Sequence, residues 1–196
     1  MGLRLSHRSP RSLALAAVVV AAAIGVLHGT TSALAQPATP DARQPLKLEA
    51  LGGAVIDIPA WRAVRHESGV AIYEQLPDPA TQRPYYVLVC TIEEGPPKGQ
   101  PIAWDKVRDN IVQSASKNQR ALTLEVKDAF TGAATFEGRR FLGELKASSP
   151  DKKVQVELVA LAKDGKLVTI GIVSDKLDGA TAELLAGIAR SARLGP

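Results

Sequence analysis

The stretch KVQVELVALAKDGKLVTIGIVS, residues 153–174, decides the fold. Apolar and other residues alternate in its first half up to Ala162, and its second half, from Lys166 to Ser174, is again rich in β-forming residues. Asp164-Gly165 separates the two halves, and a type I′ turn needs the positive φ angles that such a pair accepts. The stretch therefore predicts an antiparallel β-hairpin.

Shorter strands are predicted on either side of a helix that precedes this hairpin. YYVLVCTI, Tyr85–Ile92, is a nearly unbroken apolar run, which indicates a strand covered on both faces. A turn is predicted at Glu137-Gly138, between strands 132–136 and 140–146. The remaining predicted strands are Val55–Ile58, Trp61–His66, Val70–Leu76 and Leu122–Lys127.

Two amphipathic helices are predicted. The first covers 101–118 and is closed by Asn118, and the second begins at a candidate N-cap, Asp178. Their apolar stripes are Trp104, Val107, Ile111 and Ala115 in the first, and Leu184, Leu185, Ile188 and Ala192 in the second.

The order of these elements predicts an α+β fold, a largely antiparallel sheet covered by helices. The run 85–92 needs cover on both faces, so helices on opposite faces would bury both apolar stripes. Residues 46–196 are expected to form this single domain, and 36–45, with three prolines, a flexible leader.

The N-terminus has the pattern of an export signal. Three arginines precede the apolar run Leu13–Leu27, and Ala33-Leu34-Ala35 follows as an A-x-A cleavage site. We therefore expect residues 1–35 to be a signal peptide, cleaved between Ala35 and Gln36, and the product to be periplasmic or secreted. The alternative is an uncleaved anchor, but fifteen residues span only about 22 Å of a roughly 30 Å hydrocarbon core.

Removal of the signal also changes the charge and the chemistry of the chain. The full chain has 24 Lys+Arg and 20 Asp+Glu, and the three arginines of the signal leave 21 bases against 20 acids. A nucleic-acid partner is therefore not expected. His66 is the one histidine left, and Cys90 is the one cysteine of the chain, so an internal disulfide is excluded.

The arrangement resembles the PsbP-like α/β/α sandwich family, which includes the bacterial DcrB-like proteins, related mycobacterial lipoproteins and the Ran-binding Mog protein. The resemblance covers about residues 46–194 and implies a binding or assembly role whose partner differs between members. The chain departs from the lipoprotein members because it lacks their lipidation cysteine. The resemblance rests on five passages: IPAWRAV (58–64), SGVAIYEQ (68–75), AWDKVRDNIVQSASKN (103–118), VQVELVALAKDGKLVTIGIVS (154–174) and ELLAGIARSARL (183–194).

No catalytic residue, metal site or cofactor site is predicted. His66 is interpreted as a solvated loop histidine, and Cys90 as a small buried hydrophobe. One histidine and one cysteine are too few ligands for zinc or copper. Glu93-Glu94 and the pair Asp105 and Asp109 could contact a hard cation, but they are interpreted as a strand end and a solvated helix face.

Two groupings of side chains form the candidate partner surface, and the first joins an aromatic to cationic side chains, a combination that suits protein recognition. Core packing is the alternative for the tryptophan, and a charged hairpin tip is the alternative for the last two arginines. The first grouping is Trp61, Arg62, Arg65 and His66, and the second is Arg139 and Arg140, which follow the predicted turn at Glu137-Gly138.

Three functions remain open on the sequence. The first is an exported, non-enzymatic binding or accessory protein of the envelope, whose partner is an unidentified envelope protein or small ligand. The second is a carboxylate-based hydrolase, which needs a concave pocket that holds two acids. The third is a carrier of a small apolar ligand, which needs an apolar cavity between sheet and helix.

Overall fold

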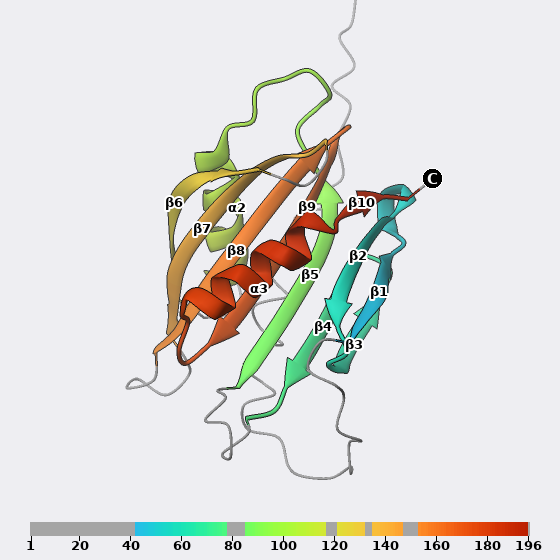
Figure 1. Cartoon of the computed structure of the whole chain (residues 1–196). Helices are drawn as coiled ribbons and strands as arrows, with labels where there is room; N and C mark the ends of the chain where they lie inside the picture. The colour runs from blue at the N-terminus through green and yellow to red at the C-terminus, as the bar shows by residue number, and fades with distance from the viewer. Residues whose placement is uncertain (1–41, 78–84, 117–120, 132–134, 147–152, 196) are drawn as a thin grey trace, which may run out of the picture.

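The structure, a computed structural model, describes residues 42–77, 85–116, 121–131, 135–146 and 153–195. These residues form two antiparallel sheets and two helices (Figure 1), which confirms the predicted α+β class. The signal peptide, its cleavage site at Ala35 and Gln36, and Asn118 lie outside the described residues.

The larger sheet has seven strands, and all neighbours in it are antiparallel. The strand from the apolar run of 85–92 lies near its centre, as its composition predicts. In spatial order the strands are β3 (Arg62–Glu67), β4 (Val70–Gln75), β5 (Tyr86–Glu94), β9 (Lys166–Ser174), β8 (Lys153–Lys163), β7 (Glu137–Lys146) and β6 (Leu122–Phe130).

The predicted hairpin is confirmed as β8 and β9. Lys163 pairs with Lys166 across the turn, and Asp164 and Gly165 have φ angles of 49° and 76°. Both central residues thus have the positive φ of a type I′ turn, whose twist matches that of the flanking strands.

The predicted turn at Glu137-Gly138 is wrong, because both residues begin β7. Gly138 pairs with Phe130 on β6, and a Cβ on this glycine would lie 2.9 Å from the Phe130 carbonyl oxygen. The glycine therefore permits a close approach of two strands.

A smaller sheet brings the two ends of the described chain together. β2 (Ala54–Pro59) lies between β1 (Arg43–Leu48) and β10 (Arg193–Leu194). The leader was predicted to extend to Pro45, but Arg43–Pro45 already belong to β1. The proline is tolerated because β1 is an edge strand.

The two helices cover opposite faces of the large sheet. α2 (Trp104–Ser116) packs on one face, while α3 (Gly179–Arg190) and the smaller sheet cover the other. Asp178 caps α3 as predicted: its Oδ1 accepts hydrogen bonds from the Thr181 amide and hydroxyl, both at 2.9 Å.

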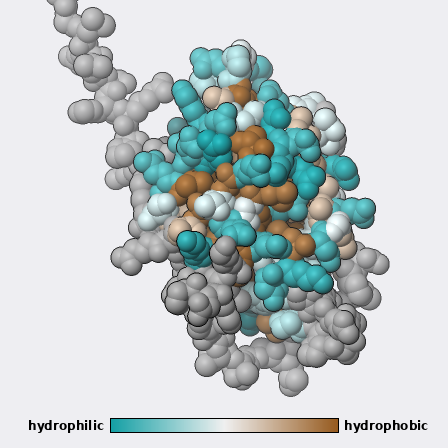
Figure 2. All heavy atoms as spheres, turned by 90° about the vertical axis from the view of Figure 1, so that its left-hand side faces the viewer, coloured by the Kyte–Doolittle hydropathy of each residue, from teal (hydrophilic) through white to brown (hydrophobic). Residues whose placement is uncertain are grey.

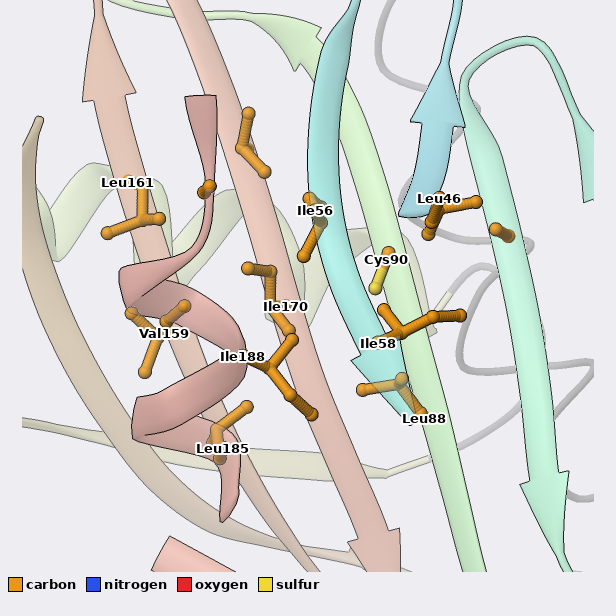
Figure 3. Close-up of a cluster of buried hydrophobic side chains, with 14 of the residues drawn as sticks. Leu46, Ile56, Ile58, Leu88, Cys90, Val159, Leu161, Ile170, Leu185 and Ile188 are labelled. Atoms are coloured by element: carbon orange, nitrogen blue, oxygen red, sulfur yellow. The ribbon is translucent and has the colours of Figure 1, made fainter. Parts of the chain in front are cut away.

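Each face of the sheet has its own hydrophobic core. Along β5, Val87 and Val89 belong to the core beneath α2, and Leu88 and Cys90 to the core beneath α3. Figure 3 shows the second core, where Ile188 of α3 lies with residues of the large sheet and of β2. The central strands are therefore buried on both sides.

The side of the molecule formed by β6 and α2 has a mixed surface. Figure 2 faces this side and shows apolar side chains gathered at its centre among hydrophilic ones. Within the part of the chain that the structure describes, no helix has the length and apolarity needed to cross a membrane.

Candidate functional site

The two groupings of the predicted partner surface lie far apart on the large sheet. Four of its residues lie on β3 or just before it, at one edge of the large sheet, and Arg139 and Arg140 lie on β7 near the other edge. Five strand spacings separate β3 from β7, about 24 Å at the usual distance between strands. The two groupings therefore remain separate in the fold, and partner binding at either one stays a prediction.

Trp61 and Arg62 are engaged within the fold. The Trp61 ring stacks on Tyr86, with centroids 6.0 Å apart and planes at 10°. Arg62 forms an ion pair with buried Glu74, whose Oε2 also accepts a 2.6 Å hydrogen bond from the Tyr85 hydroxyl. Burial raises the pKa of Tyr85, and the charge of Arg62 opposes this shift. Core packing, the alternative for Trp61, thus agrees with its contacts.

His66 and Arg65 are exposed or half-buried side chains of β3. His66 was predicted on a loop, but it belongs to this strand, and its Nε2 lies 3.0 Å from the Lys47 carbonyl oxygen, which accepts the hydrogen bond. Arg65 forms a 2.7 Å ion pair with Glu67, its neighbour on the same strand. Both side chains therefore already have polar contacts with neighbouring residues of the fold.

Arg139 and Arg140 project to opposite faces of β7, because successive strand residues alternate. Arg139 lies over the Trp104 ring, 5.9 Å from its centroid, on the α2 side. Arg140 donates to Glu157 Oε1 at 2.5 Å on the α3 side, where Glu157 is only 3% exposed. The predicted alternative of a charged hairpin tip is therefore wrong, since neither arginine lies at a turn.

Cys90 lies in the core beneath α3 and is fully buried. Burial raises the pKa of its thiol well above the usual range, because a thiolate would lose its hydration there. This placement confirms its interpretation as a small hydrophobe.

A pocket of about 520 Å³ lies between the first half of α2 and the ends of β5 and β9. Its size is that of a site for a small organic molecule. Its inner wall is apolar and is formed by Val107 and Ile111 of α2 and Leu167 of β9. The polar residues that line it are Glu93, Glu94, Gln100, Lys106, Asn110 and Ser114.

Glu93 is the chemically distinctive group of this pocket. It lies on the same face of β5 as Val87 and Val89, and it pairs in register with Leu167. Burial raises the pKa of its carboxyl to about 7, because the charged form loses hydration. Within the described residues, its carboxylate has no hydrogen-bond or ion-pair partner.

The other acids named by the sequence do not join Glu93 in a paired site. The side chain of Glu94 projects from the opposite face of β5 and is exposed. Asp105 and Asp109 are exposed on α2 and form ion pairs with Arg108, at 3.1 and 2.8 Å. Among the described residues, no group of three His, Cys, Asp or Glu side chains could hold a metal ion.

Two further hollows have similar volumes, about 510 Å³ each. One lies beside Pro96–Ile102, and the other lies between β6, β7, β8 and the start of α3. The second contains Arg140 and Glu157, whose charges are already paired. The pocket at Glu93 is therefore the best candidate site, because it holds a carboxyl that the described chain leaves without a partner.

Sequence reasoning placed Glu93 at a strand end and did not select it as a site. A signal was present, because alternation along 85–94 puts this acid on the same face as Val87 and Val89. The pocket itself depends on how α2 and the segment before it pack against the sheet, which local sequence does not specify.

No protein-family model matches the chain, and no curated protein matches it. Among solved structures, the chain is similar to LpqN, described as involved in cell envelope biogenesis of Mycobacterium tuberculosis. The similarity covers 79% of this chain and 91% of LpqN, with 18% sequence identity and a TM-score of 0.40. At this identity and TM-score the likeness transfers no function.

Proposed function

We propose that the protein is an exported, non-enzymatic binding protein of the cell envelope, and that it binds a small ligand in the pocket between α2 and the sheet. The observation that carries the proposal is Glu93, a partly buried carboxyl without a partner in the described chain, at a pocket with an apolar wall. Ligand sites typically combine apolar walls with a few such polar groups.

The export signal supports the envelope location. The n-region, apolar run and A-x-A site of residues 1–35 direct the chain to the periplasm or the medium, with cleavage before Gln36. The PsbP-like sandwich is the proposed fold family, supported by the sheet with α2 on one face and α3 on the other.

The carboxylate hydrolase is less well supported. Such an enzyme needs two carboxyl groups on either side of one reacting bond. Glu93 and Glu94 project from opposite faces of β5, so the two carboxyls do not converge within the pocket. A binding function needs only the single carboxyl and the apolar wall.

The test is to purify the exported protein from its own envelope or medium and to identify bound molecules by native mass spectrometry. Asn110→Trp places a bulky ring at the pocket rim, and Gln113→Trp places the same ring on an exposed position of α2 that does not line the pocket. We expect a bound small molecule in the wild type and in Gln113→Trp, and its loss in Asn110→Trp. A ligand retained by Asn110→Trp would place the binding site elsewhere.

A further inference from the structure

We propose that the ligand of this pocket is an organic cation, a protonated amine on an apolar body, whose ammonium group pairs with the Glu93 carboxylate. This inference rests on the function proposed above and specifies its ligand class. It follows from a comparison of half-buried Glu93 with the two fully buried acids of the large sheet.

Two other acids of the large sheet are buried, and each has an arginine. Glu74 pairs with Arg62 and also accepts a hydrogen bond from Tyr85. Glu157 pairs with Arg140 through Nη2 and Nε, at 2.5 and 3.2 Å. A buried carboxylate without a partner is costly, and these arginines remove that cost.

Glu93 is half-buried and lacks such an arginine among the described residues, and burial raises the pKa of its carboxyl. A ligand ammonium in the pocket would supply the missing charge and hydrogen-bond donors. The apolar remainder of the ligand would then lie against Val107, Ile111 and Leu167. The pocket is thus complementary to an amphipathic amine: its carboxylate suits the ammonium group, and its apolar wall suits the rest of the ligand.

The other charges around the pocket define its polarity. Lys106 reaches it from α2 but is exposed and forms no ion pair with Glu93, and Glu94 is exposed on the other face of β5. β9 contributes Leu167, and the segment before α2 contributes the uncharged Gln100. The inner charge is therefore negative, while the exposed charges around it, Lys106 and Glu94, have opposite signs, so an anionic ligand would face repulsion at the inner end.

Binding of a cation should depend on pH, because Glu93 must be ionised to pair with it. Its pKa of about 7 means that the ionised fraction rises about tenfold between pH 6 and pH 8. An alkylamine stays protonated across this range, as lysine does. The affinity for the amine should therefore rise about tenfold, while that for a neutral analogue should not change.

The experiment compares hexylamine, hexanol and hexanoate as probes of the exported protein, followed by the amide NMR signals of Glu93, Val107 and Leu167. At pH 8 we expect hexylamine to bind at least tenfold more tightly than hexanol, and hexanoate to bind most weakly. At pH 6 this preference should largely disappear. Glu93→Gln should abolish the preference yet still bind hexanol, whereas the control Glu183→Gln, at an exposed acid of α3 that does not line the pocket, should retain it.

Each contrary result has a distinct meaning. Equal binding of hexylamine and hexanol in the pocket overturns the cation proposal but leaves the ligand-binding function intact. A preference for hexanoate overturns it in favour of an anion held by Lys106. If none of the three probes perturbs the pocket signals, the cation proposal is overturned, and the native mass spectrum then decides the function separately.

Discussion

Burial of the Glu93 carboxyl disfavours its ionised form, and this makes the stability of the protein depend on pH. Its pKa is about 7 in the folded protein and 4.5 when unperturbed. Between these values the folded state holds a proton that the unfolded state has released, so stability falls as the pH rises from 4.5 to 7. With 1.36 kcal/mol for each pKa unit, the loss is at most about 3 kcal/mol.

Glu93→Gln should therefore stabilise the protein in alkaline but not in acidic solution. At pH 8 we expect its free energy of unfolding to exceed that of the wild type by up to about 3 kcal/mol, and at pH 4.5 the difference should vanish. Urea denaturation at both pH values measures this, with Glu94→Gln as the exposed control. An equal effect of Glu93→Gln at both pH values would contradict the assignment of the raised pKa to this group.

The ion pair of Arg140 and Glu157 gives a second prediction at the scale of single residues. Arg140→Met leaves a carboxylate that is 3% exposed without its cation, which should cost about 3 kcal/mol. The double variant with Glu157→Leu removes both charges and should recover much of that loss. Denaturation of the two single variants and the double variant measures the coupling, and strict additivity would show that the pair is already screened by solvent.

Among the elements, local sequence predicted the β8–β9 hairpin because Asp164-Gly165 has one favoured conformation between alternating runs. The same reasoning failed at Glu137-Gly138, where the glycine serves a close approach of β6 and β7. A glycine in a turn and a glycine at a close approach of two strands look alike in the sequence, because only the partner strand distinguishes them. The site was missed for the same reason: Glu93 acquires its environment from α2 and β9.

Gly143 tests the close approach between these strands. It pairs with Leu124, and a Cβ added to it would overlap the carbonyl oxygen of Thr123 on β6. Gly143→Ala should force the two strands apart and cost roughly 1–3 kcal/mol. Gly179→Ala is the matched control, because a Cβ there meets nothing within 4 Å. Thermal unfolding should show a lower Tm for the first variant alone, and equal Tm values would mean that the strands have room for a methyl group.

At the scale of the molecule, the order of elements along the chain predicted a sheet between two helices, but it did not predict the position of each strand in the sheet. β3 and β4 form one edge, and the hairpin β8–β9 inserts between β5 and β7. That order arises from pairing between segments far apart in the chain, which no local pattern encodes. The distance between the two groupings of the candidate partner surface, on β3 and on β7, consequently could not be read from the sequence.

The shared central strands should make the two cores unfold together. Trp61 reports on the core beneath α3 through its contact with Tyr86, and Trp104 reports on the core beneath α2. In Trp61→Phe and Trp104→Phe, the fluorescence of the remaining tryptophan should follow the same urea transition as far-UV circular dichroism. Leu88→Ala, which opens a cavity only in the core beneath α3, should lower both midpoints by the equivalent of about 2–5 kcal/mol. A shift confined to the Trp61 signal would mean that α2 and its core are stable without the opposite layer, and the sheet would then not transmit stability between its faces.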